Sequence, residues 1–108
     1  MDQDPVVSNP ENYRLVFEND RVRVLEYRDG PGTKTTEQGH PDSVMITLSG
    51  FRRRLYNGGK ELEVELPAGA ARRVPAQTHA GENIGDTLSH SFFIELKEPN
   101  RVRVRGQK

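Results

Sequence analysis

The chain has 108 residues, of which 32% are hydrophobic and 30% charged, and its 16 basic residues balance its 16 acidic ones. This length supports one hydrophobic core, so we expect a single domain over residues 1–108. A formal charge of zero gives no long-range field that would attract nucleic acid or an anionic membrane, and we expect neither as a partner. Because the apolar fraction is low, we expect further apolar surface to be buried in a homodimer.

The chain contains no cysteine. This excludes disulfides and thiolate ligands, so any metal ion would be held by nitrogen and oxygen donors. The first five residues are acidic rather than apolar, and no apolar run is long enough to span a bilayer. We therefore expect a cytoplasmic protein.

Short alternating segments separated by Gly, Pro, Asn and Asp predict an all-β sandwich or barrel of about eight to ten strands, because no helical periodicity of useful length is present. The domain core is expected at about 13–98, and residues 77–86 are expected to form a loop. The alternating tail over 100–105 is expected to form a C-terminal edge strand. The main predicted strands are 13–18, 21–28, 43–49, 51–56, 61–66, 71–75 and 89–98.

Two of these segments carry an apolar face at a period of two residues. In 43–49 we expect this face to be the inside of the strand. In 89–98 the same face includes a histidine. The residues concerned are Val44, Ile46 and Leu48 in the first segment and His90, Phe92, Ile94 and Leu96 in the second.

The segments 51–56 and 61–66 allow a prediction of strand register. A two-residue turn at Gly58-Gly59 pairs Leu55 with Leu62 on one face and Arg54 with Glu63 on the other. Moving the turn back by one residue would oppose an apolar side chain to a lysine. We therefore predict the first register, and we interpret the three arginines at 52–54 as a solvated face and not as a nucleic-acid site.

His40 and His79 each follow a polar loop beside an apolar strand. A barrel of about eight strands has room for one small ligand, and inward histidines from opposing strands would meet near its mouth. Gln38 lies two residues before His40, so in an extended segment both project to the same side. A metal ion needs three or more such donors around one point. The candidate metal ligands are therefore Gln38, His40 and His79.

Two spaced motifs in the chain resemble those of the small single-domain cupins. The first motif is Gly32, five residues, Gln38-Gly39-His40 and a strand ending at Gly50. The second is Gly69, five residues, Pro75, His79, three residues and Asn83. The likeness covers about 15–97 and is greatest to a bacterial cytosolic subgroup with strings like HPDSVMVTLSG, PAQTHAGENIGDT and FVELK. It implies a jelly-roll barrel, the double-stranded β-helix of RmlC-like proteins.

In cupins with a full ligand set, three histidines and a glutamate hold Fe, Mn, Ni, Zn or Cu. Here Gln38 stands at the first histidine, and Val44 stands near the place of the glutamate. The resemblance therefore implies a small-molecule pocket with an altered Gln/His/His site. Two functions stay open: a metal-dependent enzyme of the dioxygenase, isomerase or cyclase type, and a non-catalytic cupin that binds a small ligand.

Further polar residues are candidates for the pocket or for contacts behind the ligands. Glu37 is expected to be a carboxylate at the rim, and Glu82 a carboxylate that orients an imidazole. Arg73 would bind an anionic substrate or lie at the surface. Asn83 would fix a loop through backbone hydrogen bonds, and His90 would be a hydrogen-bonded core histidine or a pocket contact.

Overall fold

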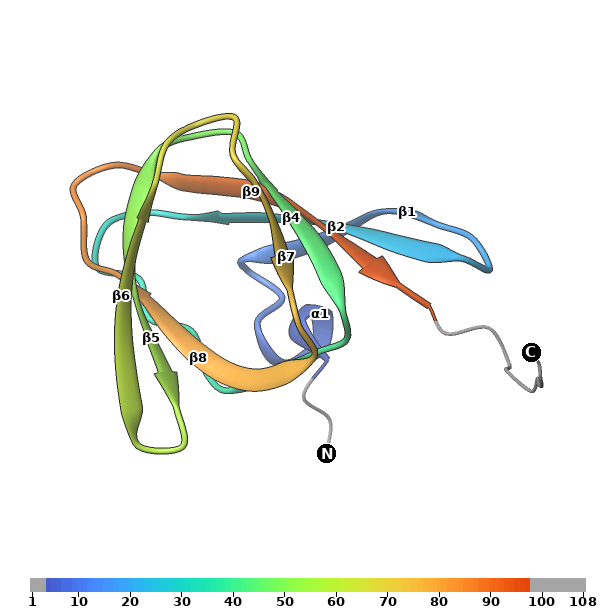
Figure 1. Cartoon of the computed structure of the whole chain (residues 1–108), viewed down its shortest axis with the longest axis horizontal. Helices are drawn as coiled ribbons and strands as arrows, with labels where there is room; N and C mark the ends of the chain where they lie inside the picture. Colours follow the sequence, from blue (N-terminus) through green and yellow to red (C-terminus); the bar gives the residue numbers. More distant parts are fainter. Residues whose placement is uncertain (1–3, 98–108) are drawn as a thin grey trace.

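The computed structural model describes residues 4–97. The predicted strand at 100–105 lies outside the described residues. Within them the chain forms nine strands and one short helix (Figure 1). The elements are α1 Pro5–Ser8, β1 Tyr13–Glu18, β2 Val22–Asp29, β3 Gln38–His40, β4 Ser43–Thr47, β5 Phe51–Asn57, β6 Lys60–Leu66, β7 Ala71–Val74, β8 Gln77–Asn83 and β9 Ser89–Leu96.

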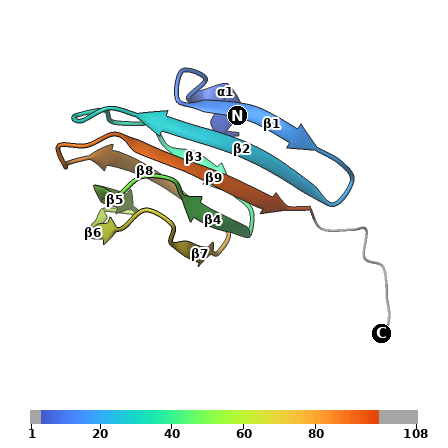
Figure 2. The same ribbon diagram turned by 90° about the horizontal axis from the view of Figure 1, so that it is seen from above.

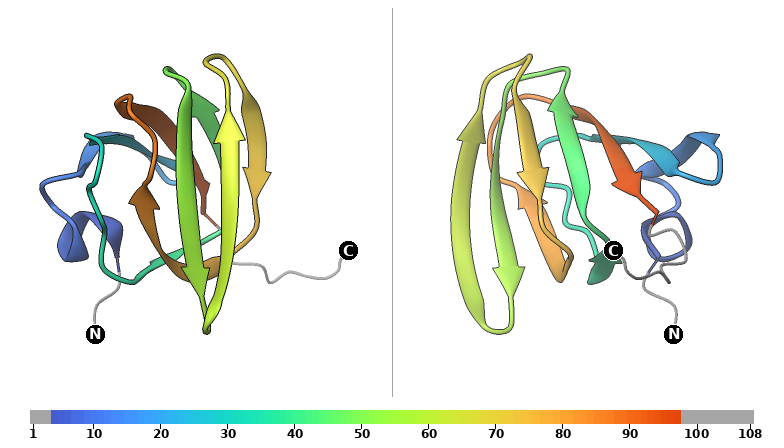
Figure 3. Two further views of the ribbon diagram at one scale, coloured as in Figure 1. Left: turned by 90° about the vertical axis from the view of Figure 1, so that its left-hand side faces the viewer. Right: turned by 45° about the vertical axis from the view of Figure 1, so that its right-hand side comes forward.

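The strands form two antiparallel sheets. One has the order β1-β2-β9-β4-β7 and the other the order β3-β8-β5-β6. In Figure 1, β2, β9 and β4 lie across the upper part of the barrel and β8, β5 and β6 lie below and to the left, and Figures 2 and 3 show the same strands from above and from the sides. Apart from β1–β2 and β5–β6, neighbours in each sheet come from distant parts of the chain, as in a jelly roll. The all-β double-stranded β-helix expected from the sequence is confirmed.

The β5–β6 hairpin has the predicted register. Leu55 lies opposite Leu62, and Arg54 lies opposite Glu63. The turn is at Gly58 and Gly59, whose φ angles of 57° and 83° fall in the left-handed region that glycine adopts at little cost. The Arg54 Nη2 atom lies 2.7 Å from Glu63 Oε2 on the outer face.

The structure reverses the expected inside of β4 and β9. Val44 pairs with Ile94 and Ile46 with Phe92 across the two strands, and these side chains lie on the outer face. The inner faces instead carry small hydroxyl side chains with a methionine and a phenylalanine between them. Those inward residues are Ser43, Met45 and Thr47 on β4 and Ser89, Ser91 and Phe93 on β9.

Hydrogen bonds explain how hydroxyl groups can lie inside the barrel. Ser43 Oγ donates to the Pro41 carbonyl at 2.8 Å, and Thr47 Oγ1 donates to the Pro67 carbonyl at 2.7 Å. Because these buried groups are paired, they carry little desolvation cost. Small inward side chains also leave space that leucine or isoleucine would have filled.

The prediction of a loop over 77–86 is wrong for the first seven of these residues, which form β8. This strand pairs with β3 on one side and β5 on the other. Its inward positions include His79 and Gly81, which give no apolar alternation to detect. Hydrogen bonds to two neighbouring strands hold it extended, and a single sequence does not display that support.

The apolar core is small and lies beside the N-terminal segment. Tyr13, Leu25 and Tyr27 are buried, with Phe93 and Val6 packed against them. The Tyr13 and Tyr27 ring centroids are 4.7 Å apart. None of the helical structure in residues 4–97 has the length and apolar character of a membrane span. The homodimer and the cytoplasmic location stay predictions.

Candidate functional site

A cavity of about 110 Å³ lies between the two sheets. Its walls are mainly apolar, and polar side chains reach it at a few points, as in small-molecule sites generally. The apolar part of the wall includes Met45, Leu55, Val64, Leu66, Val74 and Phe93. The polar part includes Gln38, Arg53, Gln77 and His79.

Of the two histidines of the motifs, His79 lines this cavity and His40 lies next to it. They come from β3 and β8, neighbouring strands of one sheet and not opposing walls, with His40 opposite Gln77 and Gln38 opposite His79. The His40 and His79 ring centroids are 4.9 Å apart, with the ring planes tilted by 44°. His40 also stacks on Phe93, with a centroid distance of 5.6 Å. The two imidazoles are therefore close together, but they reach this position from one sheet and not from opposing strands as expected.

Four buried polar atoms in this region have no hydrogen-bond partner among the described residues. They are Nδ1 and Nε2 of His40, Nδ1 of His79 and Oε2 of Glu95. His40 Nδ1 and Glu95 Oε2 are 3.9 Å apart, which is too far for a hydrogen bond. Each unpaired buried group costs about 1–3 kcal/mol of folding free energy. Their grouping marks the place where a ligand would recover most of that loss.

Burial controls the charge of both imidazoles. It lowers the pKa of His40 to about 4, with smaller contributions from His79 and Arg23. Burial also lowers the pKa of His79, assisted by the positive charge of Arg53. Both rings are therefore neutral at pH 7, and each can offer one N–H donor and one nitrogen acceptor.

Glu95 completes the histidine cluster and was not predicted. It lies on the inner face of β9 and is 3% exposed. Its Oε1 atom accepts a hydrogen bond of 2.9 Å from Arg23 Nε, and Arg23 in turn donates to both carboxylate oxygens of Asp4. Burial raises the pKa of Glu95, although Arg23 opposes the shift. Glu95 lies on the same face of β9 as Ser91 and Phe93, because side chains alternate along a strand. Knowing which face of β9 is inside would therefore have identified Glu95 as an inward residue.

Gln38 is buried beside the histidines, but its amide is already in use. Its Oε1 atom accepts from Asn9 Nδ2 at 3.0 Å, and its Nε2 atom donates to the Tyr13 hydroxyl at 3.2 Å. Val44, near the place of the family's glutamate, lies on the outer face, and the neighbouring Met45 lines the cavity instead. The residues therefore do not fit the four-ligand metal centre. In residues 4–97, no three His, Asp or Glu side chains are arranged to hold a metal ion.

A second buried polar cluster is centred on Arg53, which the sequence analysis grouped with the surface arginines. Its Nη1 atom donates to Asp29 Oδ2 at 2.6 Å and to Ser89 Oγ at 3.4 Å. The Asp29 side chain is fully buried and also accepts from the Tyr27 hydroxyl and from Asn83 Nδ2. Arg53 lies two residues from both Phe51 and Leu55, so all three project from the same face of β5. That alternation would have identified Arg53 as an inward residue.

Asn83 has the loop-fixing role that was expected of it. Its Nδ2 atom donates to the Thr87 carbonyl at 2.9 Å, and its Oδ1 atom accepts from the Gly85 backbone N–H at 3.0 Å. It is 1% exposed. The asparagine thus links the β8–β9 loop to Asp29, behind the cavity.

The other candidates lie away from the cavity. Arg73 is at the surface, with a side chain 70% exposed that lies 3.4 Å from Asp42, so its role in binding a substrate is not supported. Glu82 accepts from the Tyr56 hydroxyl on the outer face and orients no imidazole. His90 Nε2 lies 2.6 Å from Glu26 Oε2 on the outer face of β9, so it is neither a core nor a pocket residue. Glu37 is exposed.

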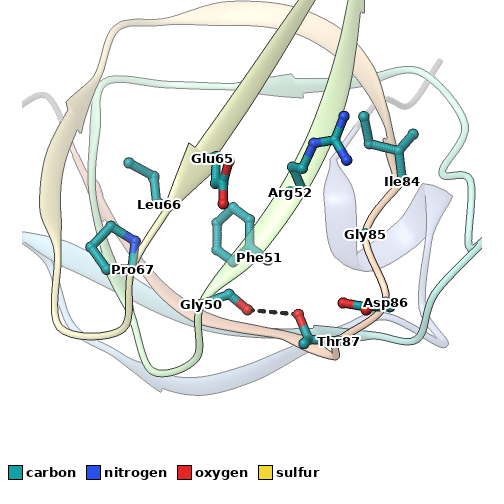
Figure 4. A pocket seen from close by; sticks show the side chains of 10 residues that line it. All are labelled: Gly50, Phe51, Arg52, Glu65, Leu66, Pro67, Ile84, Gly85, Asp86 and Thr87. Atoms are coloured by element: carbon teal, nitrogen blue, oxygen red, sulfur yellow. Dashed lines mark hydrogen bonds between the residues drawn. The ribbon is translucent and has the colours of Figure 1, made fainter.

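An open groove of about 780 Å³ lies at one end of the barrel, where three loops meet. Figure 4 shows Phe51 and Leu66 at its floor, with Arg52 and Asp86 at its sides. Phe51 and Leu66 also line the interior cavity, so they separate the two spaces. Arg52 contacts Glu63 at the surface. The groove lacks the unpaired buried groups that mark the histidine cluster.

No family model matches the sequence, and no curated protein matches it. Solved structures do resemble the fold. A cupin domain from Bordetella pertussis Tohama I is 26% identical with a TM-score of 0.74, over 80% of this chain and 92% of that one. A double-stranded β-helix protein from Klebsiella pneumoniae is 21% identical with a TM-score of 0.63, over 82% and 76% of the two chains. An RmlC-like cupin from Methanocaldococcus jannaschii is 13% identical with a TM-score of 0.64, over 81% and 80%.

Proposed function

We propose that this chain, a small protein with the cupin fold, binds a small organic molecule in the cavity between its two sheets. The observation that carries the proposal is the position of His79, which lines the cavity while its Nδ1 atom and both nitrogens of the adjacent His40 lack partners. Folded proteins leave few buried polar groups unpaired, so a group of them in one place calls for an explanation such as a bound molecule. The proposal requires no metal ion.

The cavity limits the size of the molecule. A cavity of about 150 Å³ lined by aliphatic side chains holds benzene. The present cavity of about 110 Å³ therefore suits a ligand of roughly four to six non-hydrogen atoms. Its mainly apolar walls favour a short apolar body, and the neutral imidazoles favour a ligand that can exchange a hydrogen bond with them.

Mass spectrometry of untagged protein under native conditions tests the proposal. We expect a fraction of the molecules to carry an added small-molecule mass that is released on denaturation and can then be identified. A Val64→Phe variant, which fills the cavity from β6, should lose the added mass. Glu61→Phe on the outer face of the same strand is the matched control and should retain it. Equal loading of the two variants would contradict an interior site.

A metal-dependent enzyme of the dioxygenase, isomerase or cyclase type is the second candidate. One observation favours it: His40 and His79 lie with their ring centroids 4.9 Å apart and have ring nitrogens without a partner among residues 4–97. Metal analysis of untagged protein separates the candidates. Close to one Fe, Mn, Ni, Zn or Cu per chain, lost in His40→Ala, would favour the enzyme, whereas the binding protein is expected to carry far less. Gln38→His, which restores the family's histidine, should raise the metal content in either case.

A further inference from the structure

We infer that Arg53 presents a ready-made carboxylate site to the cavity, so that the ligand is a short-chain carboxylic acid. The inference rests on the proposed function, because it assigns a chemical class to the molecule bound there. It starts from the hydrogen bonds that Arg53 makes and from those that it leaves unmade.

The guanidinium group is held in place from three directions. Its Nη1 atom donates to Asp29 Oδ2 and to Ser89 Oγ, and its Cζ atom lies 5.1 Å from the centre of the Tyr27 ring. The side chain is 11% exposed and lines the cavity. A group fixed in this way binds a partner with little further loss of conformational freedom.

The opposite edge of the guanidinium, formed by Nε and Nη2, donates to no group among residues 4–97 in the hydrogen bonds of the structure. Gly81 on β8 faces this edge. A Cβ atom at Gly81 would lie 2.8 Å from Nη2 and 3.5 Å from Nε. Glycine at position 81 therefore lets the strand lie close to this edge, and any larger residue there would crowd the two N–H groups that face the cavity.

The geometry selects a carboxylate over a neutral group. Nε–H and Nη2–H point the same way from one planar edge, and together they match the two oxygens of a carboxylate. An amide or alcohol offers one acceptor oxygen and would leave one of the donors unpaired. Asp29 does not compete for this edge, because its oxygens already accept from Arg53 Nη1, the Tyr27 hydroxyl and Asn83.

The remainder of the cavity accounts for the body of the acid. His79 lies two residues from Gly81 on the same face of β8, a distance of about 7 Å along the strand. A four-carbon acid with its carboxylate beside Gly81 therefore spans most of the space to the imidazole. Met45, Leu55 and Phe93 line that space and suit a short alkyl chain, and a polar group at the far end of the chain would pair with the His79 imidazole.

Butyrate and butyramide form a matched pair of probes, since each has six non-hydrogen atoms and only the first has two equivalent oxygens and a charge. Titration of ¹⁵N-labelled protein, followed by amide NMR, gives the affinity of each. We expect butyrate to shift the Gly81 and His79 amide signals and to bind at least about tenfold more tightly than butyramide.

Two variants test the assigned edge. Gly81→Ala puts a Cβ atom 2.8 Å from Nη2, which blocks or displaces the Nε/Nη2 edge, and Arg53→Lys keeps the charge but lacks the planar edge. Each should weaken butyrate binding at least about tenfold and change butyramide binding little. Gly30→Ala, whose new Cβ atom would meet only Leu88 at 3.9 Å, is the control and should bind as the wild type does.

Equal affinity for the two probes, or a preference for butyrate that survives in both variants, would overturn the carboxylate site and leave the proposed function intact. Failure of both probes to shift any cavity resonance would also overturn it. In that case the native mass spectra decide separately whether the proposed function fails as well, because they detect a bound molecule of any class.

Discussion

The barrel encloses two buried polar clusters that differ in how far their hydrogen bonds are satisfied. Around Asp29 the carboxylate accepts from an arginine, a tyrosine and an asparagine. Around His40 both ring nitrogens lack partners within residues 4–97, and a carboxylate oxygen of Glu95 lies 3.9 Å from one of them. A satisfied cluster stabilises the fold, whereas an unsatisfied one costs free energy that a ligand can offset. The comparison separates Asp29, a carboxylate held by its partners, from His40, whose ring nitrogens are open to a ligand.

The largest effect is expected at the satisfied cluster. Asp29→Ala removes the only carboxylate that contacts Arg53 in residues 4–97 and leaves its charge buried. Loss of one partner of a buried ion pair costs about 3–5 kcal/mol, so urea unfolding should show a fall of that order. Glu63→Ala, which breaks exposed contacts with Arg52 and Arg54, is the control and should show a much smaller fall. Similar losses for the two variants would mean that Asp29 is no anchor.

A pH-dependent effect is expected at the unsatisfied cluster. The pKa of His40 is about 4 in the folded chain against 6.5 ordinarily, so between these values the unfolded chain binds the extra proton more readily. The contribution of His40 is therefore complete above pH 6.5 and is lost as the pH falls toward 4. Urea unfolding of wild type and His40→Leu should diverge over this window, by on the order of 3 kcal/mol in favour of the variant at pH 4.

The pH dependence of the contribution of Glu95 to stability has the opposite sign, because the pKa of Glu95 in the folded chain is raised above the ordinary value of 4.5. Its contribution is complete below pH 4.5 and is lost as the pH rises through the folded pKa. Glu95 is present in both proteins, so it largely cancels in the difference between them. NMR of the imidazole signals checks the premise directly: a His40 midpoint near pH 6.5 would contradict the burial argument.

The smallest effect is expected for His40→Leu at neutral pH. The substitution removes two buried nitrogens that have no partner and keeps a side chain of similar size against Phe93. Removing unpaired polar groups is neutral or stabilising, here by about 1–2 kcal/mol. Chemical unfolding at pH 7.5 measures the change. A clear loss of stability would show that the ring has a partner in solution, and the contrast with Asp29 would then disappear.

Several features could be predicted because they depend on residues close together in the chain. The β5–β6 register follows from two glycines that permit the turn and from charges that pair only in one alignment. The inward positions of Gln38 and His40 follow from their spacing of two on one short strand. The turn residues between short alternating segments indicated an all-β fold, and the resemblance of two motifs to those of the cupins implied the double-stranded β-helix.

The tertiary structure alone decided which face of each strand is inside. Alternation in β4 and β9 distinguishes two faces, but a barrel that keeps a cavity places serines inward and lets valine and isoleucine face out. It also decided the partner of each buried charge: Arg53 meets Asp29 from 24 residues away, and Glu95 comes within 3.9 Å of His40 from the last strand. Local alternation follows from the pleat of a strand, whereas pairing inside the barrel depends on how the two sheets close around one another.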